Sequence, residues 1–230
     1  MKVSLLQYTP EPERTVALAA RLCYSSASIG ELNEKFSTAD ITDFLAKIMS
    51  LGHQSVLEHA SFTFGIEGIS RACSHQLVRH RLASYSQQSQ RYVTLKGEEF
   101  PLVLPATISS SPRREEIFSG AVKAAARAYR ELVDDGVPAE DARFVLPNAA
   151  ETKIIVTMNA RELLHFFELR CCERAQWEIR AMAIEMLRIV KPAAPVIFSS
   201  AGPGCLVGPC PEGAMTCGMV KEVRKKFNSL

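Results

Sequence analysis

Residues 79–92 hold the side chains of this chain that are best suited to chemistry. Arg79, His80 and Arg81 are followed by serines and glutamines and then by Arg91. Arginine offers a planar five-donor fork that matches phosphate and carboxylate geometry, and serine and glutamine add short neutral hydrogen bonds. The segment therefore indicates a site for an anionic ligand that also carries a polar heterocycle. A solvated polar loop after a helix is the simpler alternative.

The helix expected before this segment carries further polar side chains. Ser70 predicts its N-cap. Arg71, His75 and Arg79 recur at intervals of four residues, so they are expected to share one helix face. That face leads directly into residues 79–81, and we therefore expect it to look into the site.

A second capped helix is expected from residue 160. Asn159 and Glu162 have the spacing of a capping pair, and Arg161 and His165 would share one face of the helix. The free N–H groups at such a helix start favour an anionic ligand.

The other patterns predict an α+β fold, with helices packed on a mostly antiparallel sheet. Residues 25–36 are small and polar and are expected to form a surface loop. In the last long helix, Trp177 is expected to face inward. Strands are expected at residues 3–7, 61–66, 92–94 and 152–158, and helices at residues 12–23, 112–135 and 175–190, with another that Ser37 and Asp40 would cap and Gly52 would end.

No internal repeat and no linker is recognisable before residue 191. We therefore expect residues 1–190 to form a single domain and residues 191–230 to form an irregular tail that contains proline, glycine and cysteine. A zinc knuckle in this tail is an alternative. However, Cys205, Cys210 and Cys217 lack a Cys-x-x-Cys pair and a clear fourth ligand, so no metal is expected there.

Composition excludes several classes of protein. The 230 residues are 47% hydrophobic and 23% charged, and a net charge of +2 is too small to indicate general nucleic-acid binding. No apolar run approaches the ~18 residues of a membrane span, and the first residues do not resemble a signal peptide. Seven cysteines, two of them adjacent, fit reduced thiols better than disulfides. We expect a cytoplasmic protein without nucleic-acid or membrane partners.

Two common enzyme motifs do not occur in the sequence. There is no Gly-x-Gly-x-x-Gly fingerprint, which argues against a Rossmann dinucleotide domain. There is also no Gly-x-Ser-x-Gly nucleophile elbow, which argues against a hydrolase that uses this motif. His53, Glu58 and His59 leave a zinc enzyme open as an alternative, but they have neither zinc-protease spacing. Ser55 and Glu58 are explained equally well by a short helical turn.

The pattern of residues 79–92 resembles the signature of the flavin-dependent thymidylate synthases. Further segments are similar to the family's other blocks and occur in the family's order. These segments are residues 52–59, 142–147, 159–161 and 169–170 with 175–179. The resemblance covers about residues 1–190 and leaves out the tail.

The resemblance implies an enzyme that converts dUMP to dTMP. Methylenetetrahydrofolate would supply the carbon, and FAD reduced by NADPH would supply the hydride. The family assembles its active sites from several subunits of a homotetramer.

The resemblance also implies roles for particular residues. Arg170 would be catalytic, as a cation that favours negative charge on the pyrimidine, and His53 would lie near the folate. FAD would be held by Ser55, Arg79, His80, Arg81, Leu82, Gln87, Asn159, Ala160, Arg161 and His165. The nucleotide would contact Gln76, Leu77, Val78, Arg79, Gln87, Gln88, Ser89, Gln90, Arg91, Arg143 and Arg170.

One position departs from the family's pattern. The family usually has a glutamate where this chain has Gln87, which keeps an acceptor but loses the negative charge. Ser89 is expected to position the nucleotide, and its alternative is a nucleophile without an assigned base. A rival of another class is a module that binds RNA through the arginine-rich loop, although only Tyr85 and Tyr92 are available there for base stacking.

Overall fold

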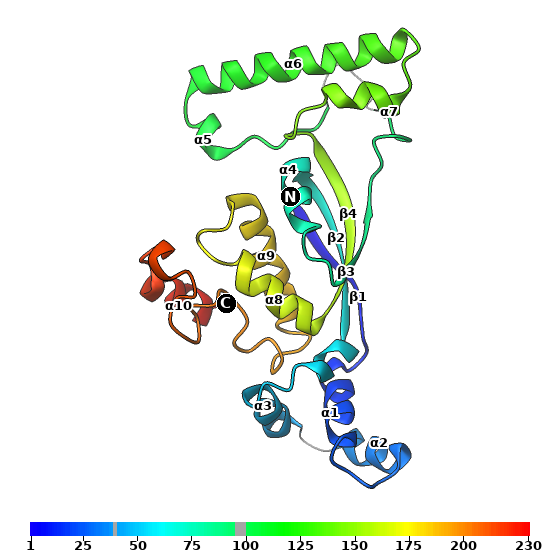
Figure 1. Cartoon of the computed structure of the whole chain (residues 1–230), viewed down its shortest axis with the longest axis vertical. Coiled ribbons are helices and arrows are strands. Elements are labelled where there is room, and N and C mark those ends of the chain that lie inside the picture. Colours follow the sequence, from blue (N-terminus) through cyan, green and yellow to red (C-terminus); the bar gives the residue numbers. More distant parts are fainter. Residues whose placement is uncertain (39–40, 95–99) are drawn as a thin grey trace. The chain divides into compact units, whose positions relative to one another are not determined.

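Four strands form one antiparallel sheet in the order β1-β2-β4-β3 (Figure 1). The structure is a computed structural model that describes residues 1–38, 41–94 and 100–230. The strands are β1 (Lys2–Tyr8), β2 (Ser61–Ser70), β3 (Ala83–Gln87) and β4 (Glu151–Asn159). In the middle of the sheet, the hydroxyls of Thr63 on β2 and Thr157 on β4 bond at 2.9 Å.

Helices account for most of the remaining structure. They are α1 (Pro12–Leu22), α2 (Ile29–Thr38), α3 (Thr42–Ser50), α4 (Arg71–Leu77), α5 (Ala106–Ser109), α6 (Pro112–Asp134), α7 (Ala139–Ala142), α8 (Ala160–Arg170), α9 (Trp177–Val190) and α10 (Val220–Asn228), with 3-10 turns η1 (Ser55–His59), η2 (Arg143–Val145) and η3 (Gly213–Met215). The predicted α+β class with an antiparallel sheet is confirmed.

The chain divides into two compact units. Unit 1 contains residues 1–2, 66–79 and 85–155, and unit 2 contains residues 3–65, 80–84 and 156–230. All four strands therefore have residues in both units. Each unit has its own apolar core.

The core of unit 2 is rich in aromatic rings. The Phe198 ring lies edge-on to Phe62 of β2, with centroids 5.4 Å apart, and to Phe167 of α8, at 6.0 Å. Helix α8 also packs against α9. Each fully buried phenylalanine contributes ~1.5–3 kcal/mol through its removal from water. This packing fixes α8, the helix on which several candidate site residues lie.

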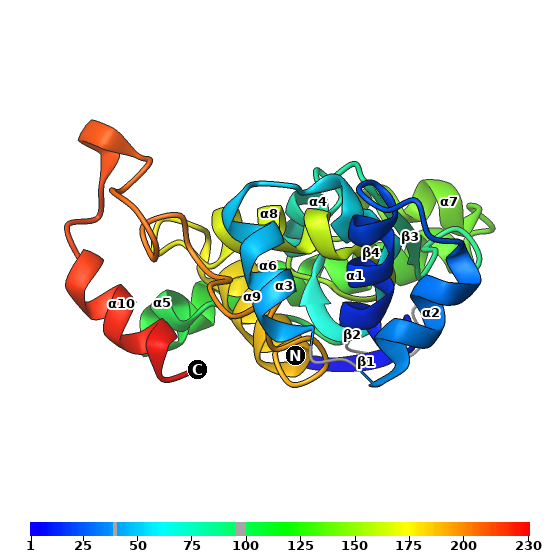
Figure 2. The same ribbon diagram turned by 90° about the horizontal axis from the view of Figure 1, so that it is seen from below.

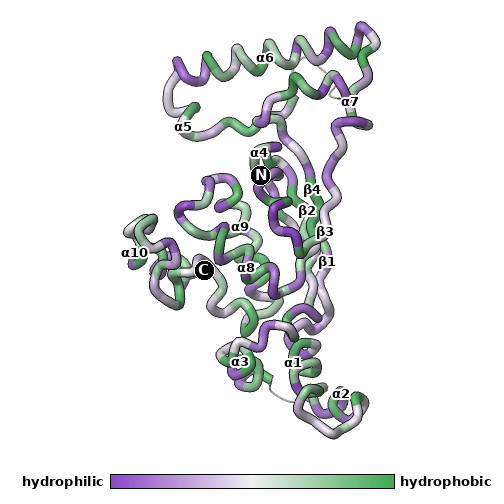
Figure 3. The backbone as a smooth tube through the Cα atoms, in the orientation of Figure 1, coloured by the Kyte–Doolittle hydropathy of each residue, from purple (hydrophilic) through white to green (hydrophobic). Residues whose placement is uncertain are grey.

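The core of unit 1 forms against the long helix α6. Val122 and Ala126 of α6 pack with Phe100 and Ala150. Hydrophilic and hydrophobic residues alternate along α6 in Figure 3, as expected for a helix that buries one stripe.

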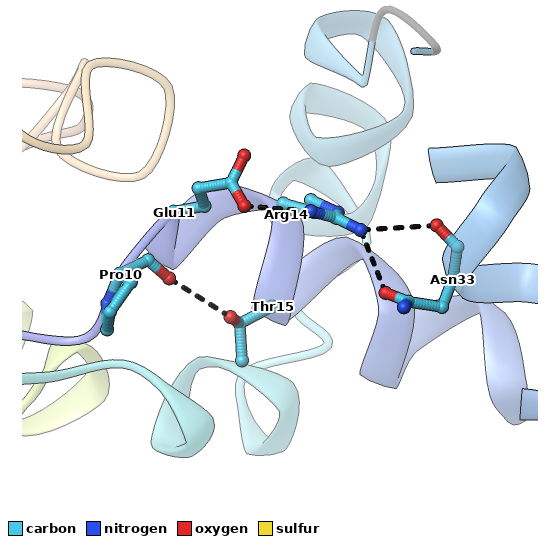
Figure 4. A network of polar contacts seen from close by, with 5 residues as sticks. All are labelled: Pro10, Glu11, Arg14, Thr15 and Asn33. Carbon is cyan, nitrogen blue, oxygen red and sulfur yellow. Dashed lines mark hydrogen bonds and ion pairs between the residues drawn. The ribbon is translucent and has the colours of Figure 1, made fainter. Parts of the chain in front are cut away.

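A polar network joins α1 to α2 in unit 2 (Figure 4). The Arg14 guanidinium bonds Glu11 Oε2 at 2.7 Å and Asn33 Oδ1 at 2.9 Å. Glu11 precedes α1 in the left-handed region at φ 45°, which is uncommon for a residue with a Cβ. The surface loop expected at residues 25–36 was wrong, because α2 occupies much of that range.

Three further expectations were wrong. Residues 92–94 are not a strand, and α4 ends at Leu77, so Arg79 lies beyond the helix on which it was expected. Trp177 is 42% exposed and does not face inward. The cap predicted from Ser37 and Asp40 falls outside the described residues, since Asp40 is not among them.

The tail is more ordered than the sequence suggests. Residues 191–219 run mainly as turns, and α10 follows them (Figures 1 and 2). Val223 and Phe227 of α10 are buried. A Cβ built on Gly202 would lie 3.0 Å from the Phe227 ring, so the close approach of this ring depends on the glycine.

Helices long and apolar enough to cross a membrane are not found among the described residues. In the same part of the chain, no group of three or more His, Cys, Asp or Glu side chains is arranged to hold a metal ion. None of the seven cysteines forms a disulfide.

Candidate active site

The two units divide the predicted site residues between them. The residues expected to hold the flavin lie in unit 2, except Arg79 and Gln87. The residues expected to contact the nucleotide lie in unit 1, except Arg170. Each group is described within its own unit.

Unit 2 has an open cavity of about 360 Å³ along one face of α8. Three of the predicted flavin residues, Leu82, Arg161 and His165, line it. The predicted pairing of Arg161 and His165 on one helix face is therefore confirmed. The other lining residues are Gln54, Glu162, Leu164 and Glu168.

Helix α8 begins with the cap that the sequence predicts. Asn159 Oδ1 accepts a hydrogen bond from the Glu162 N–H at 2.9 Å. Arg161, in the first turn, forms an ion pair with Glu58 of η1, and both side chains are about half exposed. Glu58 therefore supports the position of Arg161.

His80 lies buried between two charged side chains of α8. Its Nδ1 is 3.1 Å from Glu162 Oε1, and Arg170 Nε donates to its Nε2 at 3.0 Å. His80 and Glu162 are each 4% exposed. The Phe166 ring packs edge-on against the imidazole at 4.9 Å, and the His165 ring lies 5.9 Å away.

Burial controls the protonation of this group. Burial first, and then the positive charges of Arg170 and His165, lower the pKa of His80 from its ordinary 6.5 to about 4. Burial also raises the pKa of Glu162. His80 is therefore neutral at pH 7, and its Nε2 carries the lone pair that Arg170 requires.

The remaining predicted residues of unit 2 lie at its surface, except Ala160, which is fully buried. Ser55 and Arg81 are exposed. His53 is also exposed, and its Nε2 lies 3.4 Å from the Tyr24 hydroxyl. Because Glu58 pairs with Arg161, the contacts of these side chains give no support to the zinc alternative.

In unit 1 the segment after β3 forms a turn. Ser89 Oγ accepts a hydrogen bond from the Arg91 N–H at 3.1 Å, and Arg91 Nε bonds Glu140 Oε2 at 2.7 Å. Arg143 Nε donates to the Glu140 carbonyl at 3.0 Å. Glu140 thus contacts two of the arginines that were predicted to bind the nucleotide, Arg91 and Arg143. Gln88 and Gln90 belong to the same segment.

Gln87 is held by two hydroxyls. Its amide Nε2 donates to Ser74 Oγ at 2.9 Å and to Thr152 Oγ1 at 3.1 Å. The Ser74 hydroxyl itself donates to the Arg71 carbonyl at 3.0 Å. Ser74 is therefore an acceptor toward Gln87, which suits an amide better than a carboxylate.

The end of α4 presents few polar side chains. Leu77 is fully buried, whereas Val78 and Arg79 are exposed and Gln76 is partly buried. The Leu77 carbonyl accepts from the Tyr85 hydroxyl at 2.9 Å. The Leu77 side chain thus belongs to the core.

One charged residue near the candidate sites was not predicted, and another, Arg71, was expected only as part of the helix face that leads into residues 79–81. Glu162 was interpreted only as a capping residue, although Leu163 and Phe166 beside it on α8 are buried. A glutamate on the buried stripe of a helix needs a polar partner, and this is the signal that could have identified it. In unit 1, burial and then the charge of Arg143 lower the pKa of Arg71.

Comparison of the sequence with known proteins matches the chain to one family. Residues 4–196 match the family described as "Thymidylate synthase complementing protein". The chain is 73% identical over its whole length to the "Flavin-dependent thymidylate synthase" of Geobacter sulfurreducens, covering 99% of that protein. It is 49% identical to the protein of the same name from Clostridium tetani, over 99% of this chain and 97% of the relative. For the Pyrococcus furiosus protein of that name the identity is 46%, over 100% and 98%. The chain therefore belongs to the family of flavin-dependent thymidylate synthases.

Proposed function

We propose that this chain converts dUMP to dTMP. Methylenetetrahydrofolate supplies the carbon, and FAD reduced by NADPH carries the hydride. The observation that carries the proposal is the 73% identity, over the full length of the chain, to a protein named for thymidylate synthesis with a flavin. The ordered motif blocks of the sequence support the same reaction.

The cavity of unit 2 suits a flavin. Its volume of about 360 Å³ falls in the range of roughly 300–1,000 Å³ that is usual for small-molecule sites. Leu82 and Leu164 offer apolar surface, and Arg161 offers donors beside the capped start of α8. Bound FAD would supply the hydride chemistry there, while the protein's residues orient it.

The arginines of unit 1 suit the nucleotide's phosphate. Arg91 is about half exposed, and among the described residues it pairs with the carboxylate of Glu140, which a phosphate dianion can replace. The positive charges of Arg71 and Arg143 lie close enough to influence each other, and an anion between them would relieve that repulsion. We assign Ser89 to the positioning of this ligand, through the turn that holds Arg91.

Arg170 has the properties needed to activate the pyrimidine. Uracil C5 becomes nucleophilic as negative charge builds on the ring, and a fixed guanidinium favours that charge without reorganisation. The side chain is partly buried, and its Nε is held by the neutral ring of His80. This fixed orientation supports the catalytic role.

The family resemblance extends the proposal to assembly and location. We propose a homotetramer with shared active sites that acts in the cytoplasm. Seven cysteines without a disulfide suit a reducing compartment.

A turnover assay tests the proposed reaction. The chain, once freed of bound flavin, should form dTMP when dUMP, methylenetetrahydrofolate, NADPH and FAD are all present, and omission of any one should abolish the product. Product formation without added folate, or its absence in the complete mixture at full flavin occupancy, would contradict the proposal.

A further inference from the structure

Glu162, His80 and Arg170 form a line of hydrogen bonds inside unit 2. The Glu162 carboxylate and the Arg170 guanidinium contact opposite nitrogens of the same imidazole, at 3.1 and 3.0 Å. Glu162 and Arg170 belong to α8, while His80 comes from the segment that joins α4 to β3. The fold therefore places His80, which belongs to residues 79–92, against α8.

Only one arrangement of protons satisfies all three side chains. Arginine has donors and no acceptor, so His80 Nε2 must present its lone pair to Arg170 Nε–H. The ring proton must then lie on Nδ1, where the Glu162 carboxylate accepts it. A carboxylate beside Nδ1 thus selects the tautomer that can hold the arginine, in the way that outer partners orient ligating histidines.

The bond to His80 also limits how Arg170 can bind a ligand. With Nε engaged, the guanidinium presents the end-on pair of Nη1 and Nη2 groups for bidentate contact. The edge-on packing of Phe166 against His80 restricts the imidazole further. The orientation of Arg170 is therefore set by the ring, and the state of the ring is set by Glu162.

We propose that Glu162 is a positioning residue that fixes Arg170 through the His80 tautomer. This inference rests on the proposed function, since it assigns Arg170 its task. Glu162 acts through another residue and is not itself catalytic. Its backbone N–H forms the cap with Asn159, so changes to its side chain leave that cap in place.

A double-mutant cycle tests the coupling. Glu162→Gln keeps the shape and one acceptor but removes the charge that favours the Nδ1–H tautomer. At saturating FAD and dUMP, we expect kcat per bound flavin to fall about tenfold, the scale usual for residues in one hydrogen-bonded network. In an Arg170→Lys background the same change should cost less than twofold, because the arginine that it positions is gone. Equal fractional losses in the two backgrounds would overturn the proposal.

A matched control and a direct measurement separate this role of Glu162 from a general loss of folded structure. Glu185→Gln removes a carboxylate from an exposed ion pair on α9 and should leave kcat unchanged. Nitrogen NMR of the wild-type protein should find His80 as the Nδ1–H tautomer, and Glu162→Met should weaken that preference. An Nε2–H tautomer in the wild type would contradict the inference even if every variant at residue 162 failed to fold. A wild type that retains flavin but forms no dTMP would instead contradict the proposed function.

Discussion

Arg170 occupies a position where two physical roles predict different outcomes of substitution. It is the last residue of α8, where a cation is stabilised by the helix dipole by under ~1 kcal/mol at an exposed site. It also holds a directed hydrogen bond to His80. The first role needs only a charge, whereas the second needs the planar fork.

The substitution Arg170→Lys separates these roles. Lysine keeps the charge but cannot bond His80 and present a bidentate pair as well. We expect the variant to fold and to retain FAD, while dTMP formation falls by about 10²-fold, the usual effect of losing one stabilising donor. Arg188→Lys, on the exposed part of α9, is the matched control and should be unaffected. Near-normal turnover of Arg170→Lys would exclude the proposed role.

Ser89 is expected to position and not to attack. Its Oγ already accepts the Arg91 N–H, and its removal loosens the turn that carries this arginine. Ser89→Ala should therefore lose ~1–2 kcal/mol of transition-state stabilisation in kcat/KM. Ser86→Ala, at an exposed position in β3, serves as the control. Isolation of a nucleotide joined covalently to Ser89 would contradict this role.

His80 should make stability depend on pH. Its folded pKa of about 4 lies below the ordinary value of 6.5. Between pH 4 and 6.5 the imidazole is therefore protonated in the unfolded chain but neutral in the folded chain, which lowers the free energy of unfolding. This contribution is complete above pH 6.5 and is lost as the pH falls toward 4. Glu162 opposes the trend, because its raised pKa lets the folded state take up a proton first.

Denaturant unfolding at a series of pH values measures this contribution. Between pH 7 and 5 the free energy of unfolding should fall more in the wild type than in His80→Gln, whose amide can replace both hydrogen bonds without titrating. His165 and the other titratable groups are present in both proteins, so their effects cancel in the comparison. An identical pH dependence would show that His80 does not titrate as described.

Residue types in the sequence predict donors well and their partners poorly. Arg161 and His165 could be placed on one helix face because helical spacing determines it. The contact of Glu162 with His80 joins residues 82 positions apart, and no local pattern encodes such a pair. The same holds for Gln87, whose departure from the family's glutamate is explained only by the orientation of the Ser74 hydroxyl.

At the scale of elements, β3 and its surroundings give a test of that explanation. Gln87→Glu would place a carboxylate oxygen against Ser74 Oγ, whose proton is donated to the Arg71 carbonyl. We expect the substitution to lower the free energy of unfolding by ~1–3 kcal/mol, because a buried hydroxyl must rotate or leave an acceptor unpaired. Gln88→Glu, at an exposed side chain, should change stability by less than ~0.5 kcal/mol. A more stable Gln87→Glu variant would contradict this account of the position.

The sequence predicted those helices whose ends carry clear start and stop residues, such as proline, glycine or a capping side chain. Pro112 and Gly136 bound α6, and Asn159 caps α8 with the expected hydrogen bond. Helix α2 was missed because much of its stabilisation comes from tertiary contacts, such as the bonds from Arg14 to Asn33 (Figure 4). The inward direction expected of Trp177 failed because it is the first residue of α9, where tertiary packing and not helical period decides exposure.

At the scale of the whole molecule, the sequence predicted the fold class but not the division into two units. Hydrophobic alternation identified β2 and a β-branched run identified β4, yet nothing in either pattern marks the point inside the strand where one unit ends and the other begins. The tail was expected to be irregular, but Val223 and Phe227 anchor α10, and the glycine that admits the Phe227 ring lies 25 positions earlier. Local sequence patterns do not predict such packing, because its partners lie far apart in the chain.

The absorbance spectrum of the purified protein tests most directly whether this chain works through a flavin. We predict a band near ~450 nm whose chromophore is released on denaturation, because FAD is held by reversible contacts. The band should return when FAD is added to the refolded chain. A colourless preparation that takes up no added FAD, or one that binds RNA with steep salt dependence and no flavin, would contradict the account.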